Sequence, residues 1–462
     1  YRNIGRTLFD ASYEFTDLTE HFTSLKINYY HQNIRRDVIM LPNSVTNVIL
    51  PNGMTQRTTP DSITPNGLHV TNGAQLQGTF KFGKNNTLIA GADFWRRDMT
   101  SDRTKYITMQ VIKPTGEIAQ THYLQRFETP VPTSSYTSIG AFVQDEAHFF
   151  NNHLTLTAGL RADEILVANK ACYDVDSIIR DGNLVQALTQ RTTFAANNVS
   201  NFAWSGNIGL LYKINNKMDL VFNVARSFRS PSLEERFKYI DLGNFVRIGD
   251  PNLKPEHGYS ADLGYRIWGD KFTLQASAYV NRLTDMIAET QGQFVYSLTG
   301  SENDLDTVPA IIYANVSKAL LYGFDFKADY EVINNLTLSL ACSYVRGRNT
   351  EAKTDLPLIP PFNGVFSISY TYPKVGTATF YARGAAKQDK IAEGETITDG
   401  YYRLDFSLNT RRFNLGKRCG LQIFAGVDNF TNNAYTNHLS TNRGSISIEP
   451  GINGYGRVSF TF

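Results

Sequence analysis

Strict alternation of apolar and polar residues is the main pattern in this chain. Over residues 322–330, tyrosine, phenylalanine and alanine hold every second position, and glycine, aspartate and lysine fill the positions between them. The same alternation returns over residues 402–411 and 455–462. Because successive side chains of a β-strand point to opposite faces, each segment is predicted to be a strand with one apolar face. Apolar residues at helical spacing are not found, so the chain is predicted to be all-β.

The chemistry of the polar face decides which medium the apolar face meets, since soluble sandwiches also alternate. Arg403, Asp405 and Arg411 lie on one face of residues 402–411, and Asp325 and Lys327 lie on one face of residues 322–330. A charged inner face behind an aromatic outer face is typical of a transmembrane barrel with a wet or protein-filled lumen. No run of about 18 apolar residues occurs, which excludes a helical membrane protein. We therefore predict a transmembrane antiparallel β-barrel.

The connections between the predicted strands alternate between short and long, as in barrels of the bacterial outer membrane. In such barrels the short turns are periplasmic and the long loops extracellular. Short turns are predicted near residues 16–20, 84–86, 151–153, 215–217, 269–271, 333–335, 372–375 and 413–417. Long loops are predicted near residues 36–74, 100–135, 167–202, 228–256, 290–316, 346–360, 389–398 and 429–453.

These connections separate about 17 strands, whereas single-chain bacterial barrels have an even number. The last predicted strand ends on the periplasmic side at Phe462, which we expect to be the membrane-insertion end. The missing strands are therefore expected before Tyr1, and residues 1–462 are expected to be the C-terminal part of a larger barrel.

Charge and cysteine content remove several classes of function. The net charge is +2, with acidic and basic residues mixed along the chain, so a nucleic-acid partner has no electrostatic support. No local spacing suits a metal site, and no nucleophile, base and orienting group stand in combination, so we expect neither a bound metal nor an enzyme. No role is assigned to the three cysteines, Cys172, Cys342 and Cys419.

The segment from residue 227 to 256 is polar and rich in fixed-shape residues. Pro231, Pro251 and Pro255 exclude an ordinary strand or helix at either end, and they are predicted to fix the shape of the loop. Charged, amide and phenol side chains of this segment are the candidate ligand-binding residues. These candidates are Arg229, Glu234, Glu235, Arg236, Tyr239, Asn252 and Lys254.

Several blocks resemble the TonB-dependent outer-membrane receptors, and the resemblance spans most of the chain. Residues 141–146 and 154–162 are similar to a mid-barrel hairpin of that family, and residues 427–430 with Tyr435 are similar to the end of its penultimate strand. Phe228-Arg229-Ser230-Pro231 and residues 250–256 resemble two boxes that bracket an external loop in the haem-uptake branch. Serine stands at 230 where alanine is usual, and aspartate at 250 where asparagine is usual.

The resemblance implies an active transporter in the outer membrane. It implies a barrel of about 22 strands with a plug domain inside, which the TonB complex of the inner membrane pulls on. The plug and its TonB-contacting segment precede the barrel in this family, and neither is found in this chain. The implied partners are membrane lipid and lipopolysaccharide, the plug, the TonB complex, and an iron chelate or a surface lipoprotein that delivers it. No covalently bound cofactor is implied, and the transported ligand would be haem or a ferric siderophore.

In the haem branch a histidine between the boxes is implicated in haem binding, yet none lies between Pro231 and Asp250. Tyr239 lies in this interval, and it could ligate iron through its phenolate or simply pack the loop. His257 and His438 are the other candidate haem or metal ligands, with a solvated loop residue as the alternative for each.

Arg229, Glu234, Glu235 and Arg236 could clamp an anionic ligand, or they could join the loop to its neighbours. A passive porin and the uptake of another nutrient such as cobalamin remain alternative functions.

Overall fold

One large antiparallel sheet dominates the molecule. The computed structural model describes residues 2–186, 190–242, 245–297, 305–316, 318–416, 419–441 and 446–462. The sheet has 22 strands, and none of the helices in these residues is long and apolar enough to cross a membrane. The strands that follow one another around the sheet are β1 Arg2–Thr16, β2 Phe22–Val38, β4 Thr55–Phe82, β5 Asn86–Ile112, β7 Ser134–Phe149, β8 Leu154–Asn169, β13 Asn197–Asn215, β14 Met218–Arg229, β17 Glu256–Trp268, β18 Phe272–Thr284, β21 Ala319–Ile333, β22 Leu336–Asn349, β23 Asn363–Tyr372, β24 Gly376–Ala385, β25 Tyr401–Thr410, β27 Gly420–Asp428 and β28 Asn453–Thr461.

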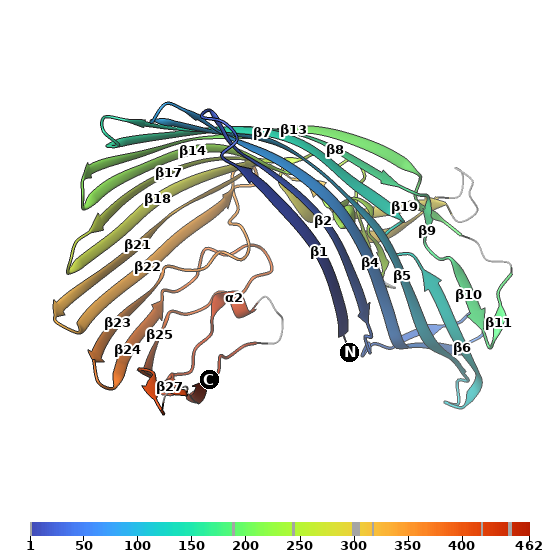
Figure 1. The fold of residues 1–462 in the computed structure, drawn as a ribbon. Coiled ribbons are helices and arrows are strands. Elements are labelled where there is room, and N and C mark those ends of the chain that lie inside the picture. Colours follow the sequence, from blue (N-terminus) through green and yellow to red (C-terminus); the bar gives the residue numbers. More distant parts are fainter. Residues whose placement is uncertain are drawn as a thin grey trace.

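The sheet is strongly curved but not closed. β1 pairs with β2 at one end and β28 pairs with β27 at the other, and within the described residues no pairing joins β1 to β28. Figure 1 shows the strands curving around a hollow interior, with the two chain ends on opposite sides of the opening. The all-β prediction is confirmed, while the number of membrane strands stays a prediction.

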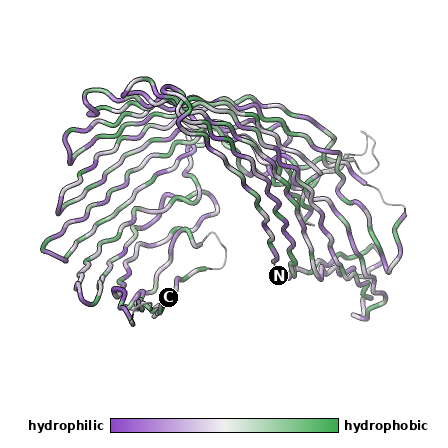
Figure 2. The backbone as a smooth tube through the Cα atoms, viewed as in Figure 1, coloured by the Kyte–Doolittle hydropathy of each residue, from purple (hydrophilic) through white to green (hydrophobic). Residues whose placement is uncertain are grey.

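The register confirms the two faces that the sequence predicted. Phe324 of β21 lies opposite Ala278 of β18 and Tyr344 of β22, on the outer, convex face. Asp325, the next residue, lies opposite two serines on the inner, concave face. Figure 2 shows the resulting alternation of hydrophobic and hydrophilic residues along neighbouring strands. Large outer side chains are widely exposed, as Phe324 is at 41%, so the described residues form no covering layer over this face.

Four of the predicted long loops, at 36–74, 100–135, 167–202 and 290–316, are wrong in extent, because more than half of their backbone is paired as strand. The predicted loop at 36–74 contains the end of β2 and more than half of β4. The predicted loop at 100–135 contains the end of β5 and β6 Ile118–Glu128, and the predicted loop at 290–316 contains most of β19 Ile287–Ser297 and all of β20 Leu305–Asn315. The long-loop end of β4 is polar or proline from Thr55 to Ser62 and has no apolar face to reveal it, and Pro60 fits within β4 because it stands at a register shift.

The remaining elements are short and lie in the connections. Two of them are helices, which the sequence analysis did not predict. These elements are β3 Thr46–Ile49, β6 Ile118–Glu128, β9 Cys172–Tyr173, β10 Ser177–Arg180, β11 Asn183–Leu184, β12 Thr192–Phe194, α1 Leu233–Phe237, β15 Tyr239–Asp241, β16 Val246–Ile248, β19 Ile287–Ser297, β20 Leu305–Asn315, β26 Phe413–Asn414 and α2 His438–Thr441.

The buried apolar core lies at the long-loop end of the molecule. A second sheet, in the order β15–β16–β20–β19, forms there from two connections that are far apart in sequence. Its β16 and β20 run parallel, with Val246 opposite Ala310. Leu233, Phe237 and Tyr239 join this sheet to inner-face residues of β5, β7 and β8 in one cluster. We call α1 together with this four-stranded sheet the loop assembly.

Candidate functional site

The two boxes at the ends of the 228–256 connection meet in space. Register places Arg229 of β14 opposite Glu256 of β17. The Arg229 guanidinium donates from Nε to Glu256 Oε2 at 2.6 Å and from Nη1 to Glu235 Oε2 at 2.8 Å. Glu256 Oε1 also accepts from the backbone N–H of Ile287 at 2.6 Å. Of the two predicted roles, these contacts support the one in which Arg229 and Glu235 join the loop to its neighbours.

The helix α1 begins at a capping box that is visible in the sequence. The Ser232 hydroxyl accepts from the backbone N–H of Glu235, and the Glu235 carboxylate accepts from the backbone N–H of Ser232 at 2.8 Å. Serine followed three residues later by glutamate is the signature of such a start, so this signal could have predicted the helix. Leu233 and Phe237 are completely buried, which fixes α1 against the core.

The Glu235 carboxylate makes the loop assembly sensitive to acid. Burial works to raise its pKa, but hydrogen bonds from Arg229 and Ser232 outweigh burial, so the pKa lies below the ordinary 4.5. Because its pKa is lowered in the folded state, the carboxylate stabilises the fold fully at pH values above its ordinary pKa. This stabilisation is lost as the pH falls through the folded-state pKa. We expect hydrogen-exchange protection factors in 228–241 to fall below about pH 4.5 in the wild type. Glu235→Gln should remove this dependence, and the same acid dependence in both proteins would contradict the assignment.

Arg236 is a completely buried cation. Its guanidinium donates from Nη1 to the Pro251 carbonyl at 2.6 Å and from Nη2 to Asn201 Oδ1 at 3.4 Å. Burial lowers the pKa of the guanidinium. Asp250 N–H donates to the Glu235 carbonyl at 3.1 Å. Arg236 therefore holds the second box against α1 and offers no surface to a ligand.

Tyr239 belongs to the core of the loop assembly. It is 7% exposed, and its ring lies 5.9 Å from that of Phe294. Burial raises the pKa of its phenol, which disfavours the phenolate that iron ligation requires. Of its two predicted roles, this placement favours packing.

The second box leaves some side chains available. Asn252 and Lys254 are exposed, while their backbone N–H groups are bonded to Asp250 Oδ1 and Asn315 Oδ1 at 2.8 Å. Pro231 is fully buried, and Pro251 and Pro255 are half-buried. Glu234 is half-buried and makes no ion pair with another described residue. The box is thus held by its backbone, with two polar side chains presented to solvent.

The two candidate histidines lie on different elements, far from each other in sequence. Register sets His257 opposite Phe228, on the outer face, where its Nδ1 lies 3.2 Å from Arg226 Nη2. His438 of α2 is 2% exposed, with Nδ1 3.2 Å from Thr398 Oγ1 and Nε2 3.9 Å from Glu395 Oε1. Neither lies in the loop assembly.

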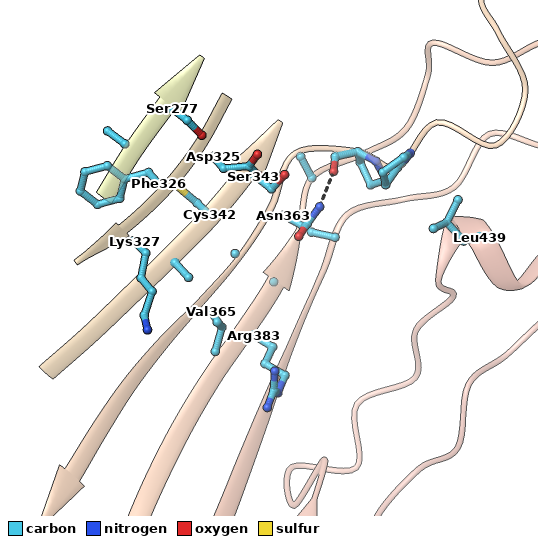
Figure 3. Close-up of a pocket in the computed structure, with 18 of the residues that line it drawn as sticks. Ser277, Asp325, Phe326, Lys327, Cys342, Ser343, Asn363, Val365, Arg383 and Leu439 are labelled. Atoms are coloured by element: carbon cyan, nitrogen blue, oxygen red, sulfur yellow. Dashed lines mark hydrogen bonds between the residues drawn. The ribbon is translucent and has the colours of Figure 1, made fainter. Parts of the chain in front are cut away.

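A cavity of about 780 Å³ lies along the inner face from β17 to β25 and reaches α2. Figure 3 shows Asp325, Ser343 and Asn363 along one side, with Leu439 of α2 across from them. Apart from His438, none of the candidate ligand-binding residues lines it. The polar positions of the alternating strands could have located this cavity from the sequence. Its charged lining residues are Asp262, Arg266, Asp325, Lys327, Arg383 and Asp399.

Inner-face charges beside this cavity pair with one another. Asp405 accepts from Arg383 Nε at 2.8 Å and from Arg403 Nη2 at 2.9 Å, and it also accepts from the backbone N–H of Asn429 at 2.8 Å. Arg403 Nη1 donates to Tyr435 Oη at 3.2 Å. The block at residues 427–430 and Tyr435 thus fasten the last long connection to β25.

Phe462 and the three cysteines lie apart from the residues described above. Phe462 is 94% exposed beyond the end of β28. All three cysteines are unpaired, and Cys172 is buried in β9 while Cys342 lies on the outer face of β22. Among the residues that the structure describes, no group of three or more His, Cys, Asp or Glu side chains is placed to hold a metal ion.

A model of the family described as TonB-dependent receptor-like β-barrel matches residues 1–430. The chain belongs to this family of receptors. TonB-dependent heme receptor A of Haemophilus influenzae (strain 86-028NP) is 27% identical over 263 residues, which are 51% of this chain and 35% of that protein. Hemoglobin-haptoglobin utilization protein B of Neisseria meningitidis is 21% identical over 311 residues, which are 62% of this chain and 37% of that protein.

Solved structures show the same barrel fold. The copper transporter OprC superposes with a TM-score of 0.73 at 18% identity, covering 99% of this chain and 66% of OprC. The ferric citrate transporter FecA superposes with a TM-score of 0.65 at 13% identity, covering 99% of this chain and 61% of FecA. This TonB-dependent receptor chain thus spans about a third of the curated relatives it matches and under two thirds of these structures.

Proposed function

We propose that this chain is part of an outer-membrane receptor that takes up an iron complex by active transport, with haem as the first candidate. The observation that carries the proposal is the family match over residues 1–430. Haem is the first candidate ligand because the names of two relatives describe a heme receptor and hemoglobin utilisation. TonB and the proton-motive force would supply the energy. A ferric siderophore is the second candidate, because the interval between the boxes holds no histidine.

We further propose that other strands pair with β1 and β28 and that a plug fills the interior. The unpaired edges of these two strands support the first part, since open sheet edges are not tolerated in the hydrocarbon of a bilayer. The charged wall of the inner cavity supports the second, because a plug would satisfy its polar groups. The long loops would be extracellular and the short turns periplasmic, by analogy with other barrels of this class.

The loop assembly and the second box that lies beside it would present the ligand surface. Arg229, Glu235 and Arg236 hold it rigid, and a preorganised surface loses less free energy on binding. Asn252 and Lys254, with exposed side chains, would contact the ligand, and Lys254 suits the propionates of haem. In this arrangement the described residues of the loop assembly hold the ligand without ligating its iron.

Titration of the complete purified receptor with haemin tests the proposal. We expect a saturable Soret shift that survives in Tyr239→Phe, because that phenol is buried and protonated. Lys254→Glu should weaken binding by roughly tenfold through the loss of one charge-assisted contact. Lys84→Glu, an exposed lysine at a short turn, is the matched control and should bind as the wild type does. Absence of a Soret shift, with saturable binding of a ferric siderophore, would reject haem.

A further inference from the structure

Three long connections meet at one buried carboxylate at the outer end of the inner cavity. The connections are 350–362 between β22 and β23, 386–400 between β24 and β25, and 429–452 between β27 and β28. Glu395 Oε1 accepts from the backbone N–H of Leu358 at 2.8 Å, and Glu395 Oε2 accepts from the backbone N–H of Ala392 at 2.9 Å. His438 places its Nε2 3.9 Å from Glu395 Oε1. The Glu395 carboxylate therefore stands where all three connections come together.

The His438 imidazole is hydrogen-bonded through one of its two nitrogens. Its Nδ1 lies 3.2 Å from Thr398 Oγ1, whereas its Nε2 has no hydrogen-bond partner among the described residues. The side chain of His438 is 1% exposed and that of Glu395 is 6% exposed, so bulk water does not reach the space between them. A buried polar atom without a partner costs free energy, which leaves this contact incomplete.

The connection 386–400 is closed on itself beside this contact. Gln388 and Thr398 are both buried, and they exchange backbone hydrogen bonds of 2.9 and 3.3 Å. Gln388 Nε2 also donates to the carbonyl of Ile359 at 2.6 Å. The connection is therefore fixed to 350–362 by two side chains, Gln388 and Glu395, while its contact with 429–452 depends on His438.

The same residues form the outer wall of the inner cavity. Pro360 and Pro361 of the first connection, Thr398 of the second and His438 of the third all line it. Figure 3 shows Leu439 of α2 across the cavity from the strands. A change in how the three connections hold together would therefore change access to the cavity from the long-loop end.

Glu395 is the one carboxylate within 4 Å of the His438 imidazole in the part of the chain that the structure describes. The other titratable groups on the surrounding elements are carboxylates, phenols, and cations that are paired or exposed. They are Arg383, Asp399 and Tyr401 of the cavity lining, Lys387, Asp389, Lys390 and Glu393 of 386–400, Tyr435 and Glu449 of 429–452, and Lys353 and Asp355 of 350–362. Carboxylates ordinarily titrate near pH 4 and phenols near pH 10, so histidine is the side chain that changes charge between about pH 5 and 8.

We propose that Glu395, Thr398 and His438 form a pH-sensitive clasp, which fastens the three connections over the outer end of the cavity when the medium becomes mildly acidic. A protonated imidazole donates from both nitrogens, so Nε2 gains the Glu395 carboxylate as a partner of opposite charge after a movement of about 1 Å. The neutral imidazole does not form this ion pair. The added stabilisation is thus present at low pH and is lost as the pH rises through the range in which histidine deprotonates. The effect of the clasp on transport rests on the uptake function proposed above, whereas the clasp itself does not.

Hydrogen exchange in the complete receptor tests the clasp, with rates corrected for the intrinsic effect of pH. In the wild type, protection in 388–398 and 436–441 should rise at least about tenfold from about pH 7.5 to about pH 5.5, since one bound proton gives at most about tenfold per pH unit. His438→Gln cannot take up a proton and should show equal protection at the two pH values. The matched control His122→Gln removes a histidine that contacts another carboxylate, Asp181 at 2.7 Å, and it should keep the wild-type response.

Glu395→Gln is a second variant, which keeps the shape of the side chain and removes its charge. It should also lose the pH response, and exchange within β7 and β8 should match the wild type in both variants because the barrel is intact. Protection in the wild type that stays constant or falls as the medium is acidified would overturn the inference, as would a wild-type response in either variant. No ligand is present in these measurements. Failure here therefore leaves the uptake function standing, and failure to bind haem or a ferric siderophore leaves the clasp standing.

Discussion

Phe237→Ala is expected to destabilise the loop assembly by about 3 to 5 kcal/mol. The side chain is completely buried, and its ring meets that of Phe194 edge-on with centroids 5.9 Å apart. Truncation removes apolar surface from the core and leaves a cavity that the capped helix α1 cannot easily collapse into. Hydrogen exchange across residues 228–256 should become faster by at least about a hundredfold.

Two further variants make this result specific. Phe237→Leu keeps most of the buried volume and should cost less than about 1.5 kcal/mol. Phe82→Ala removes a ring that is 54% exposed at the short-turn end, and exchange in 228–256 should not change. Unchanged exchange in Phe237→Ala would show that this core does not hold the connection together.

Gly249→Ala is expected to separate the second box from α1. A Cβ atom at this position would lie 2.5 Å from the carbonyl carbon of Arg236 and 2.6 Å from the carbonyl oxygens of Glu235 and Arg236. Backbone atoms cannot rotate away as a flexible side chain can. We expect a cost of about 1 to 3 kcal/mol, with faster exchange in 246–253 and weaker binding of the ligand.

Gly67→Ala is the matched control, because a Cβ atom there meets nothing within 4 Å. It should leave both exchange and ligand binding unchanged. Equal binding by Gly249→Ala and the wild type would mean that the second box does not need its position beside α1 for recognition.

The apolar face of each membrane strand could be predicted from sequence, because the alternation that identifies it lies within that one strand. Alternation over residues 322–330 assigns the outer and inner sides of β21 without knowledge of its neighbours. The paired extensions of β4 and β5 escape this logic, because residues 55–62 of β4 are all polar or proline and show no alternation. Their pairing becomes visible only when the neighbouring strands are in place.

The candidate site was predictable in part. The ion pair of Arg229 with Glu256 follows once the boxes are known to end adjacent strands, and Ser232 with Glu235 identifies α1. The burial of Tyr239 and Arg236 depends on β16 pairing with β20, which lies some 60 residues further along the chain. No feature of the sequence near Arg236 and Tyr239 indicates such a contact. The outward position of His257 has a simpler cause. His257 directly follows Glu256 in β17, and neighbouring residues of a strand point to opposite faces.

Energised uptake is the central claim for this receptor, and iron uptake from haemin by living cells tests it most directly. Cells that express the complete receptor under iron limitation should accumulate labelled haem iron, and cells that lack it should not. A protonophore that collapses the proton-motive force should stop this accumulation while binding of haemin to the cell surface persists. Accumulation that continues at the same rate without the proton-motive force would show a passive pore and contradict the account.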